Sequence, residues 1–344
     1  MSGVGSEVSA SDNTRRSFAR VKSTPISVAA DYPSAAALAD ELLGVARRGG
    51  GAFTMGLATN VQSVTRLFLG DLIEAEQHFV SGEAFLSDRG LRRSFVATWT
   101  ISLVGWNAWV TGRADKARAR VRRAVAEIAD DAFANATVRM VSSYLNVMLR
   151  EPRQAAILAA QAIAIGDEHG FREVSWWARM SDGWAQAQLG HPDEGASLIG
   201  EALTAYRANG SLLWVTFFLT WLAEAQALGG ALADGLRTLE EALTVNPPER
   251  ICRPETLRVR GEIRRQQGEG ELAEADFRDA IALAREMSAK AWELRAAMSL
   301  ARLWRDRGKR AEARDLLAPL YGWFTEGFDT ADLKNAAALL AELG

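Results

Sequence analysis

The sequence has few of the residues from which disulfide, metal and catalytic sites are built. It contains one cysteine, Cys252, and three histidines, His78, His169 and His191. A single cysteine excludes an intrachain disulfide framework and is typical of a reducing compartment. No two histidines have the spacing of a metal-ligand pair. We therefore predict no metal site, and we expect Cys252 to be a small apolar filler between helices.

Signatures of nucleotide and nucleic-acid binding are absent as well. The sequence has no GxxxxGK[ST] phosphate-binding motif, and the glycines at 49–51 are interpreted as a connector between helices. The formal net charge is −3, so composition gives no basic surface that would attract nucleic acid. We expect a protein without catalysis, without cofactors and without a nucleic-acid partner.

The apolar segments do not favour a membrane span. Residues 94–112 carry no charge, and they approach the ~20 residues that a spanning helix needs. They also include Ser, Thr, Asn and Gly, and they fit the repeat described below, so we interpret them as a buried helix. Residues 1–32 lack the apolar core of a signal peptide, and we expect a disordered tail. The sequence thus predicts a cytoplasmic protein.

A repeat with a period of about 40 residues runs through the rest of the chain. A turn residue recurs at intervals of 38 to 42 residues, and a small residue stands seven positions before it and five positions after it. The seven turn residues are Gly70, Gly112, Arg150, Gly190, Gly230, Gly268 and Gly308. A fixed period in this range marks a repeat architecture.

Each repeat is interpreted as two antiparallel helices, A and B, joined at the turn residue. Glycine there suits a helix end that needs a left-handed residue. The two small residues would face each other and let the helix axes approach closely. Arg150 is the exception, and it is followed by Pro152, which is well tolerated at the first position of a helix. We predict an all-α chain.

The repeat register predicts the domain organisation. Residues 33–48 form one helix that resembles a helix B without its partner. About seven helix pairs follow over residues 52–326, and a capping helix covers residues 331–343. The whole of residues 33–344 is predicted to be one solenoid. The unpaired first helix is what the tail of a longer protein would show.

The small–large–small spacing around the turn glycine resembles the tetratricopeptide repeat. The usual unit has 34 residues, so the units here are longer, and the aromatic positions of the consensus are mostly replaced. The resemblance implies a tetratricopeptide-like α-solenoid, a right-handed superhelix of antiparallel helix pairs.

The stretch Leu294–Leu343 resembles the C-terminal end of large bacterial regulators. In these proteins a class III adenylate cyclase domain or a DNA-binding domain precedes a predicted ATPase and a tetratricopeptide tail. The resemblance implies a regulatory or sensor module beside nucleotide signalling or transcription control. It also implies upstream ATPase- or cyclase-type domains as partners, and enzymatic parts that this chain lacks.

In tetratricopeptide arrays helix A lines the inside of the superhelix, so residues at fixed offsets before each turn should face inward. One group of these positions is aromatic: Trp99, Trp106, Trp109, Tyr144, Trp177 and Trp184. A second group is basic: Arg258, Arg265, Arg295, Arg302 and Arg305. Trp, Tyr and Arg are enriched at binding hot spots. We predict a concave groove that binds a protein or peptide, with an apolar face on the aromatic residues and an acidic part on the arginines.

Several alternatives stay open at this point. The aromatic residues can instead fill the inner channel, or they can pack against absent upstream domains. The chain can be the remnant of a cyclase or ATPase regulator, or a scaffold that self-associates through the apolar face of Leu38, Leu42 and Leu43. Trp214 and Trp292 share a position 16 residues before their turns, where we expect packing between units.

Overall fold

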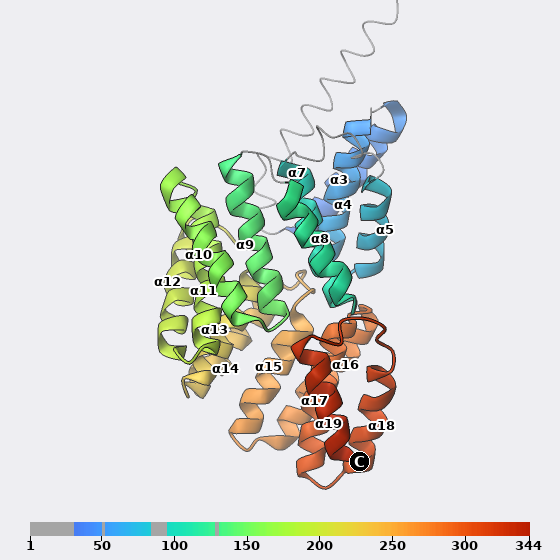
Figure 1. Cartoon of the computed structure of the whole chain (residues 1–344), viewed down its shortest axis with the longest axis vertical. Coiled ribbons are helices and arrows are strands. Elements are labelled where there is room, and N and C mark those ends of the chain that lie inside the picture. The colour runs from blue at the N-terminus through green and yellow to red at the C-terminus, as the bar shows by residue number, and fades with distance from the viewer. Residues whose placement is uncertain (1–30, 50–51, 84–94, 128–130) are drawn as a thin grey trace, which may run out of the picture.

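The structure, a computed structural model, describes residues 31–49, 52–83, 95–127 and 131–344 (Figure 1). Most of the predicted tail of residues 1–32 lies outside this part. The described ranges contain helices and no strand, which confirms the all-α prediction. The helices are α3 (Tyr32–Gly49), α4 (Ala52–Leu69), α5 (Leu72–Glu83), α7 (Phe95–Val110), α8 (Ala114–Glu127), α9 (Ala132–Met148), α10 (Pro152–His169), α11 (Arg172–Gln188), α12 (Pro192–Ala208), α13 (Val215–Leu228), α14 (Leu232–Thr244), α15 (Arg253–Gln266), α16 (Gly270–Glu286), α17 (Lys290–Asp306), α18 (Arg310–Tyr321) and α19 (Ala331–Leu343).

In the described ranges seven antiparallel pairs follow one another, from α4 with α5 to α17 with α18, and α19 packs against the last pair. All seven turn residues have a positive φ, between 59° at Arg150 and 103° at Gly190. The left-handed turn predicted for the glycines is therefore present in their six units, and the unit with Arg150 has it as well. Arg150 adopts the left-handed conformation although it carries a side chain. For a residue other than glycine this conformation costs about 1–2 kcal/mol.

The small residues meet where the helices of a pair cross. A Cβ atom on Gly195 would lie 2.3 Å from the carbonyl oxygen of Gly183, so neither position accepts a side chain without moving a helix. In the first pair the Ser63 hydroxyl donates to the Ala75 carbonyl at 2.7 Å. This close crossing keeps each pair thin, and it explains the spacing of small residues in the sequence.

The first helix, α3, packs against α4. Leu42 and Leu43 of α3 are buried together with Ala58 of α4. Two of the three residues named for self-association are therefore covered by the chain itself, whereas Leu38 is half-buried.

No helix in the described ranges is both long and apolar enough to cross a bilayer. The uncharged segment around α7 instead runs through the protein interior, where its side chains from residue 100 to residue 110 are buried.

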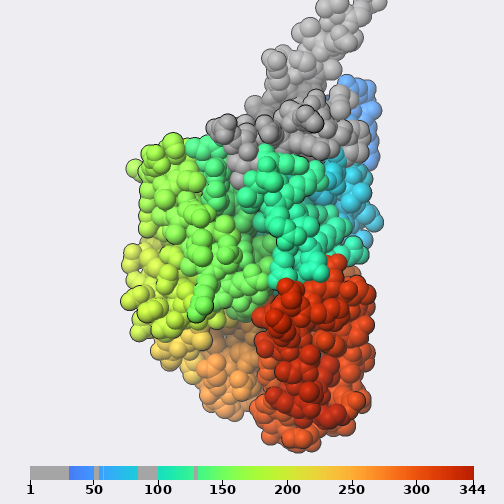
Figure 2. All heavy atoms as spheres, viewed as in Figure 1, coloured from blue at the N-terminus to red at the C-terminus, as the bar shows by residue number. Residues whose placement is uncertain are grey.

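The superhelix closes on itself, so that the last units touch the second unit. Figures 1 and 2 show the C-terminal part of the chain directly against the lower end of α8, and α17 contacts α7. Arg118 of α8 forms an ion pair with Asp329 at 2.8 Å. The carboxylate of Glu326 accepts hydrogen bonds from the backbone N–H groups of Asp115 and Lys116 at 2.9 and 3.1 Å. We call this contact between unit two and residues 321–332 the seam.

Turns on the seam side differ from turns elsewhere. A Cβ atom on Gly112 would lie 2.7 Å from the ring of Trp323 and 3.0 Å from that of Phe324, whereas a Cβ atom on Gly230 would meet nothing within 4 Å. The two glycines have similar φ angles, 88° and 83°. Gly112 is thus needed twice, for its backbone conformation and for the close approach of the C-terminal segment.

The connection between α14 and α15 joins the middle of the array to its beginning. The backbone N–H of Arg250 donates to the Phe68 carbonyl at 2.8 Å. Next to it, Glu249 is fully buried. Burial raises the pKa of its carboxyl to about 8, although hydrogen bonds that include Asn246 and Tyr32 oppose this shift. Below that pH the folded protein holds Glu249 in its neutral form.

We predict that Gly112→Ala destabilises the protein more than Gly230→Ala. Both variants place a side chain at positive φ, which costs about 1 kcal/mol. Gly112→Ala adds a clash at the seam of about 1–3 kcal/mol. Urea unfolding followed by circular dichroism measures the difference, and equal losses of stability would show that the seam is not formed in solution.

Glu249 makes the stability depend on pH. Its pKa is raised from 4.5 to about 8 on folding, so between these values the folded protein binds more protons than the unfolded chain. The free energy of unfolding therefore falls as the pH rises through this window. We expect Glu249→Gln to gain stability relative to the native chain as the pH rises from about 5 to about 8. Thermal unfolding across this range, with exposed Glu312→Gln as the control, tests this; parallel curves for all three proteins would refute it.

Candidate functional site

Aromatic side chains fill the inside of the superhelix between units two and five. We call this cluster the aromatic interior: Trp106, Tyr144, Trp177, Trp214, Phe217, Phe218 and Trp221. Trp106 stacks on Tyr144 with ring centroids 5.5 Å apart, and Trp214 lies 5.5 Å from Trp106 and 5.0 Å from Trp177. The Tyr144 hydroxyl donates to the Trp177 carbonyl at 2.8 Å. The helices of four successive units thus meet around one set of rings.

The predicted aromatic residues are mostly covered in this conformation. Trp106, Tyr144 and Trp184 are each 1% exposed. Trp109 packs edge-on against Trp292 at 4.6 Å. The side chain of Trp99 lies outside the described part of the structure. Trp177 is partly exposed. Ligand contact by Trp106, Trp109, Tyr144 or Trp184 would require the interior to open.

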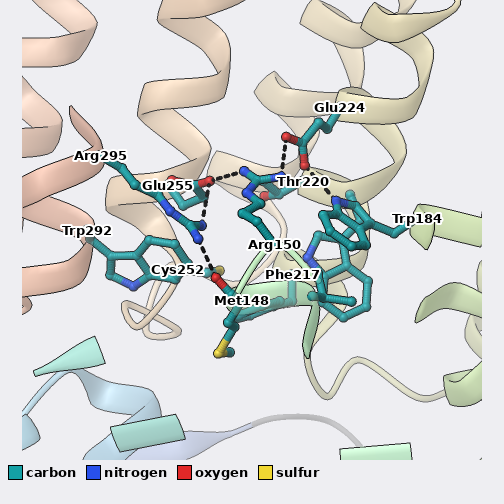
Figure 3. A pocket seen from close by; sticks show the side chains of 12 residues that line it. Met148, Arg150, Trp184, Phe217, Thr220, Glu224, Cys252, Glu255, Trp292 and Arg295 are labelled. Carbon is teal, nitrogen blue, oxygen red and sulfur yellow. Dashed lines mark hydrogen bonds and ion pairs between the residues drawn. The ribbon is translucent and has the colours of Figure 1, made fainter. Parts of the chain in front are cut away.

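A cluster of paired charges lies beside the aromatic interior (Figure 3). We call it the ionic cluster: Arg150, Glu224, Glu255, Arg258 and Arg295. Arg150 bridges two carboxylates, Glu224 at 2.6 Å and Glu255 at 2.9 Å. Arg258 binds Glu255 at 2.8 Å, and Arg295 approaches it at 3.4 Å. The side chain of Arg150 contacts both Glu224 and Glu255, which explains why the third turn has an arginine. A glycine there would remove the guanidinium that joins the two carboxylates.

The charges of the ionic cluster hold each other ionised. Burial alone raises the pKa of Glu255, but Arg258, Arg295 and Arg150 outweigh it and hold the pKa well below the ordinary range. Burial acts against the charge of Arg150, yet Glu224 and Glu255 raise its pKa above the ordinary value. Loss of Glu255 would remove the carboxylate that Arg150, Arg258 and Arg295 share, and removing a partner from a buried ion pair is destabilising.

Trp184 connects the ionic cluster to the aromatic interior. Its indole N–H donates to Glu224 at 2.8 Å, and the Arg150 guanidinium lies 5.5 Å from the centre of its ring. A cavity of about 20 Å³ remains between the two clusters. That volume holds about one water molecule. Between the described side chains of these two clusters there is thus space for a water molecule and not for a larger ligand.

A basic surface is left on the inner side of units six and seven. We call it the arginine face: Arg258, Arg265, Arg302 and Arg305, which lie on α15 and α17. Glu262 lies among them, 2.9 Å from Arg265 and 3.9 Å from Arg258, and it also accepts a hydrogen bond from Ser299 at 2.6 Å. Arg305 is paired with Asp306 and Glu342.

Arg302 differs from the other members of the arginine face. Its side chain has no hydrogen bond and no ion pair with any residue in the described ranges. Burial lowers the pKa of its guanidinium; Glu262 opposes this shift, while Arg258, Arg305 and Arg265 add to it. A half-buried arginine among like charges is a place where an anion binds favourably.

The described side chains do not assemble a nucleophile or a metal centre. Cys252 is buried, and burial raises the pKa of its thiol well above the ordinary value, which keeps it neutral and unreactive. No group of three His, Cys, Asp or Glu residues within the described ranges is placed to hold a metal ion. The arrangement is suited to binding charged groups.

The structure sorts the predicted site residues into three places. Trp106, Tyr144 and Trp177 belong to the aromatic interior. Trp109 lies beside the ionic cluster, where Arg295 is 4.8 Å from its ring centre. Four of the five predicted arginines lie on the arginine face, whereas Arg295 is buried in the ionic cluster. The prediction from inward positions does not include Arg150. The sequence nevertheless marks Arg150 as unusual, because it is the one turn residue of the seven that is not glycine.

Comparison with known proteins gives likeness in fold and none in sequence. The chain matches none of the known family models and none of the curated proteins. Among solved structures it is similar to a Rap protein complexed with competence and sporulation factor, with a TM-score of 0.61, 12% identity, and coverage of 97% of this chain and 96% of that one.

Two further solved structures share the architecture. NprR in complex with its cognate peptide NprX has a TM-score of 0.55 and 12% identity, over 83% of this chain and 81% of that one. The Cut9–Hcn1 hetero-tetramer of APC/C has a TM-score of 0.54 and 13% identity, over 92% of this chain and 53% of that one. At such identities the likeness shows the fold alone. The chain has the fold predicted from its repeat, an all-α tetratricopeptide-like solenoid.

Proposed function

We propose that this protein is a non-catalytic, regulatory scaffold that binds a peptide or protein segment carrying acidic groups. The segment lies on the inner side of units six and seven, with a carboxylate on the arginine face. The observation that carries this proposal is Arg302, a half-buried cation without a counterion among the described residues. A ligand carboxylate would supply the missing charge without displacing an existing ion pair.

The fold supports a peptide or protein as the ligand. Repeat solenoids present extended inner surfaces of the kind that hold chains. The similar structures of the Rap protein and of NprR are complexes with a named factor and with a cognate peptide. By this analogy we assign the same class of ligand here, and a regulatory role inside the cytoplasm. A place beside ATPase- or cyclase-type domains remains a prediction from the resemblance of Leu294–Leu343.

We predict that Arg302→Gln weakens binding of acidic peptides by about 10-fold or more, because one charge-assisted hydrogen bond contributes about 1.5–3 kcal/mol. The probe is a library of labelled ten-residue peptides that vary in net charge, screened by fluorescence anisotropy at two salt concentrations. The native chain is expected to retain acidic members, with affinity that falls as salt rises.

Arg237→Gln is the matched control, since Arg237 is an exposed arginine on the outer helix α14. It should leave peptide affinity unchanged. Retention of neutral and acidic peptides alike, or an Arg302→Gln affinity equal to that of the native chain, would rule out the arginine face as the ligand surface.

A second variant tests the role of the aromatic interior. Trp106→Ala removes a fully buried ring and should lower the free energy of unfolding by about 3–5 kcal/mol. Trp304→Ala, on the partly exposed side of α17, should cost less. At a temperature where Trp106→Ala stays folded, we expect native peptide affinity. A variant of normal stability that has lost peptide binding would instead place Trp106 in contact with the ligand.

A further inference from the structure

A second cavity, outside the arginine face, lies next to the seam. Its volume is about 250 Å³, more than ten times that of the interior cavity. Its walls come from both ends of the array, and they include Ile73, Thr111, Arg113, Lys116, Lys290 and Trp323. A space of this size approaches the lower end of small-molecule sites, which begin near 300 Å³.

One wall of this seam cavity is apolar and accessible. Trp323 is 46% exposed and Ile73 is 53% exposed, and both belong to the exposed large apolar residues of the described chain. Trp323 also makes a cation–π contact, since the ammonium of Lys290 lies 5.5 Å from the centre of its ring. A flat apolar group placed between Ile73 and Trp323 would cover both.

The polar wall has more positive than negative charge. Lys116 binds the carboxylate of Glu76 at 2.6 Å, and Arg120 binds the same carboxylate at 2.7 Å. Burial raises the pKa of Glu76, but the hydrogen bonds from Arg120 and Lys116 outweigh it and lower that pKa to about 2. Glu76 is thus already neutralised by two cations, and it does not offset the charge of Arg113 or Lys290.

Arg113 is the free cation of this wall. It is exposed, and it has no ion pair with any residue that the structure describes. Lys290 is paired with Glu293 at 2.6 Å, but Glu293 is also bound by Arg285 at 2.7 Å. The ammonium of Lys290 can therefore turn toward a second anion while Glu293 keeps a partner.

We propose that the seam cavity binds a small organic anion, a carboxylate or phosphate carried on a flat apolar body. The anionic group lies between Arg113 and Lys290, and the apolar body lies against Trp323 and Ile73. Because Arg113 and Ile73 come from the first two units and Lys290 and Trp323 from the last, the site is complete only when the superhelix is closed. Such a ligand stabilises the closed form.

The probes are 1-naphthaleneacetate, indole-3-acetate and phenyl phosphate, each titrated by calorimetry beside an uncharged analogue and beside inorganic phosphate. At least one probe is expected to bind the native chain, at least 10-fold more tightly than its uncharged analogue and than inorganic phosphate. Binding of none of the three, or equal binding of inorganic phosphate, would overturn the proposal.

Three variants locate the bound probe. Arg113→Gln and Lys290→Gln should each weaken it by about 5-fold or more, and Asp329→Asn should weaken it by loosening the seam. Arg153→Gln is the matched control, because Arg153 is also an exposed arginine just after a turn. Arg302→Gln should leave probe affinity unchanged, which separates this site from the peptide surface. Unaltered affinity in both Arg113→Gln and Lys290→Gln would place the probe elsewhere and refute the site.

Discussion

The closed superhelix depends on one buried arginine. Arg295 is 5% exposed, and its guanidinium touches segments that lie far apart in the sequence. It donates to the Met148 carbonyl of unit three, binds Asp332 of α19 at 2.8 Å, approaches Glu255 of unit six at 3.4 Å, and lies 4.8 Å from the ring centre of Trp109 in unit two. A planar cation with five N–H donors is the side chain that can hold so many partners at once.

Closure determines how the inside of the array is used. Once unit seven contacts unit two, the inner helices of the early units are no longer exposed to solvent. Their inward-facing side chains therefore have to be apolar or ion-paired. In the early units the inward-facing side chains are aromatic. In the middle of the array Arg150 is ion-paired with two carboxylates. The inner face of the last two units keeps unbalanced charge. The contrast between aromatic and basic halves thus follows from which inner helices closure covers.

The sequence predicts local structure better than it predicts closure. Glycine marks six of the seven left-handed turns, because a positive φ favours that residue type. The seventh, at Arg150, is indicated only by its position in the repeat. The separation of inward positions also places the arginine face. The covering of Trp106 and Trp184 was not predictable, because a period along the chain does not report how far the superhelix curves. That curvature brings Gly112 into contact with Trp323. The sequence of neither unit indicates this contact.

Closure also restricts how such a protein can change in length. An open solenoid gains or loses a unit with little consequence, since each unit touches only its neighbours. Here Arg118 meets Asp329 across 211 positions of the chain. Removing or duplicating a unit between them would rotate the last helices away from the second unit and separate the pair. The number of repeats between the two sides of the seam is therefore fixed by geometry, as in a ring, although the chain is a linear array.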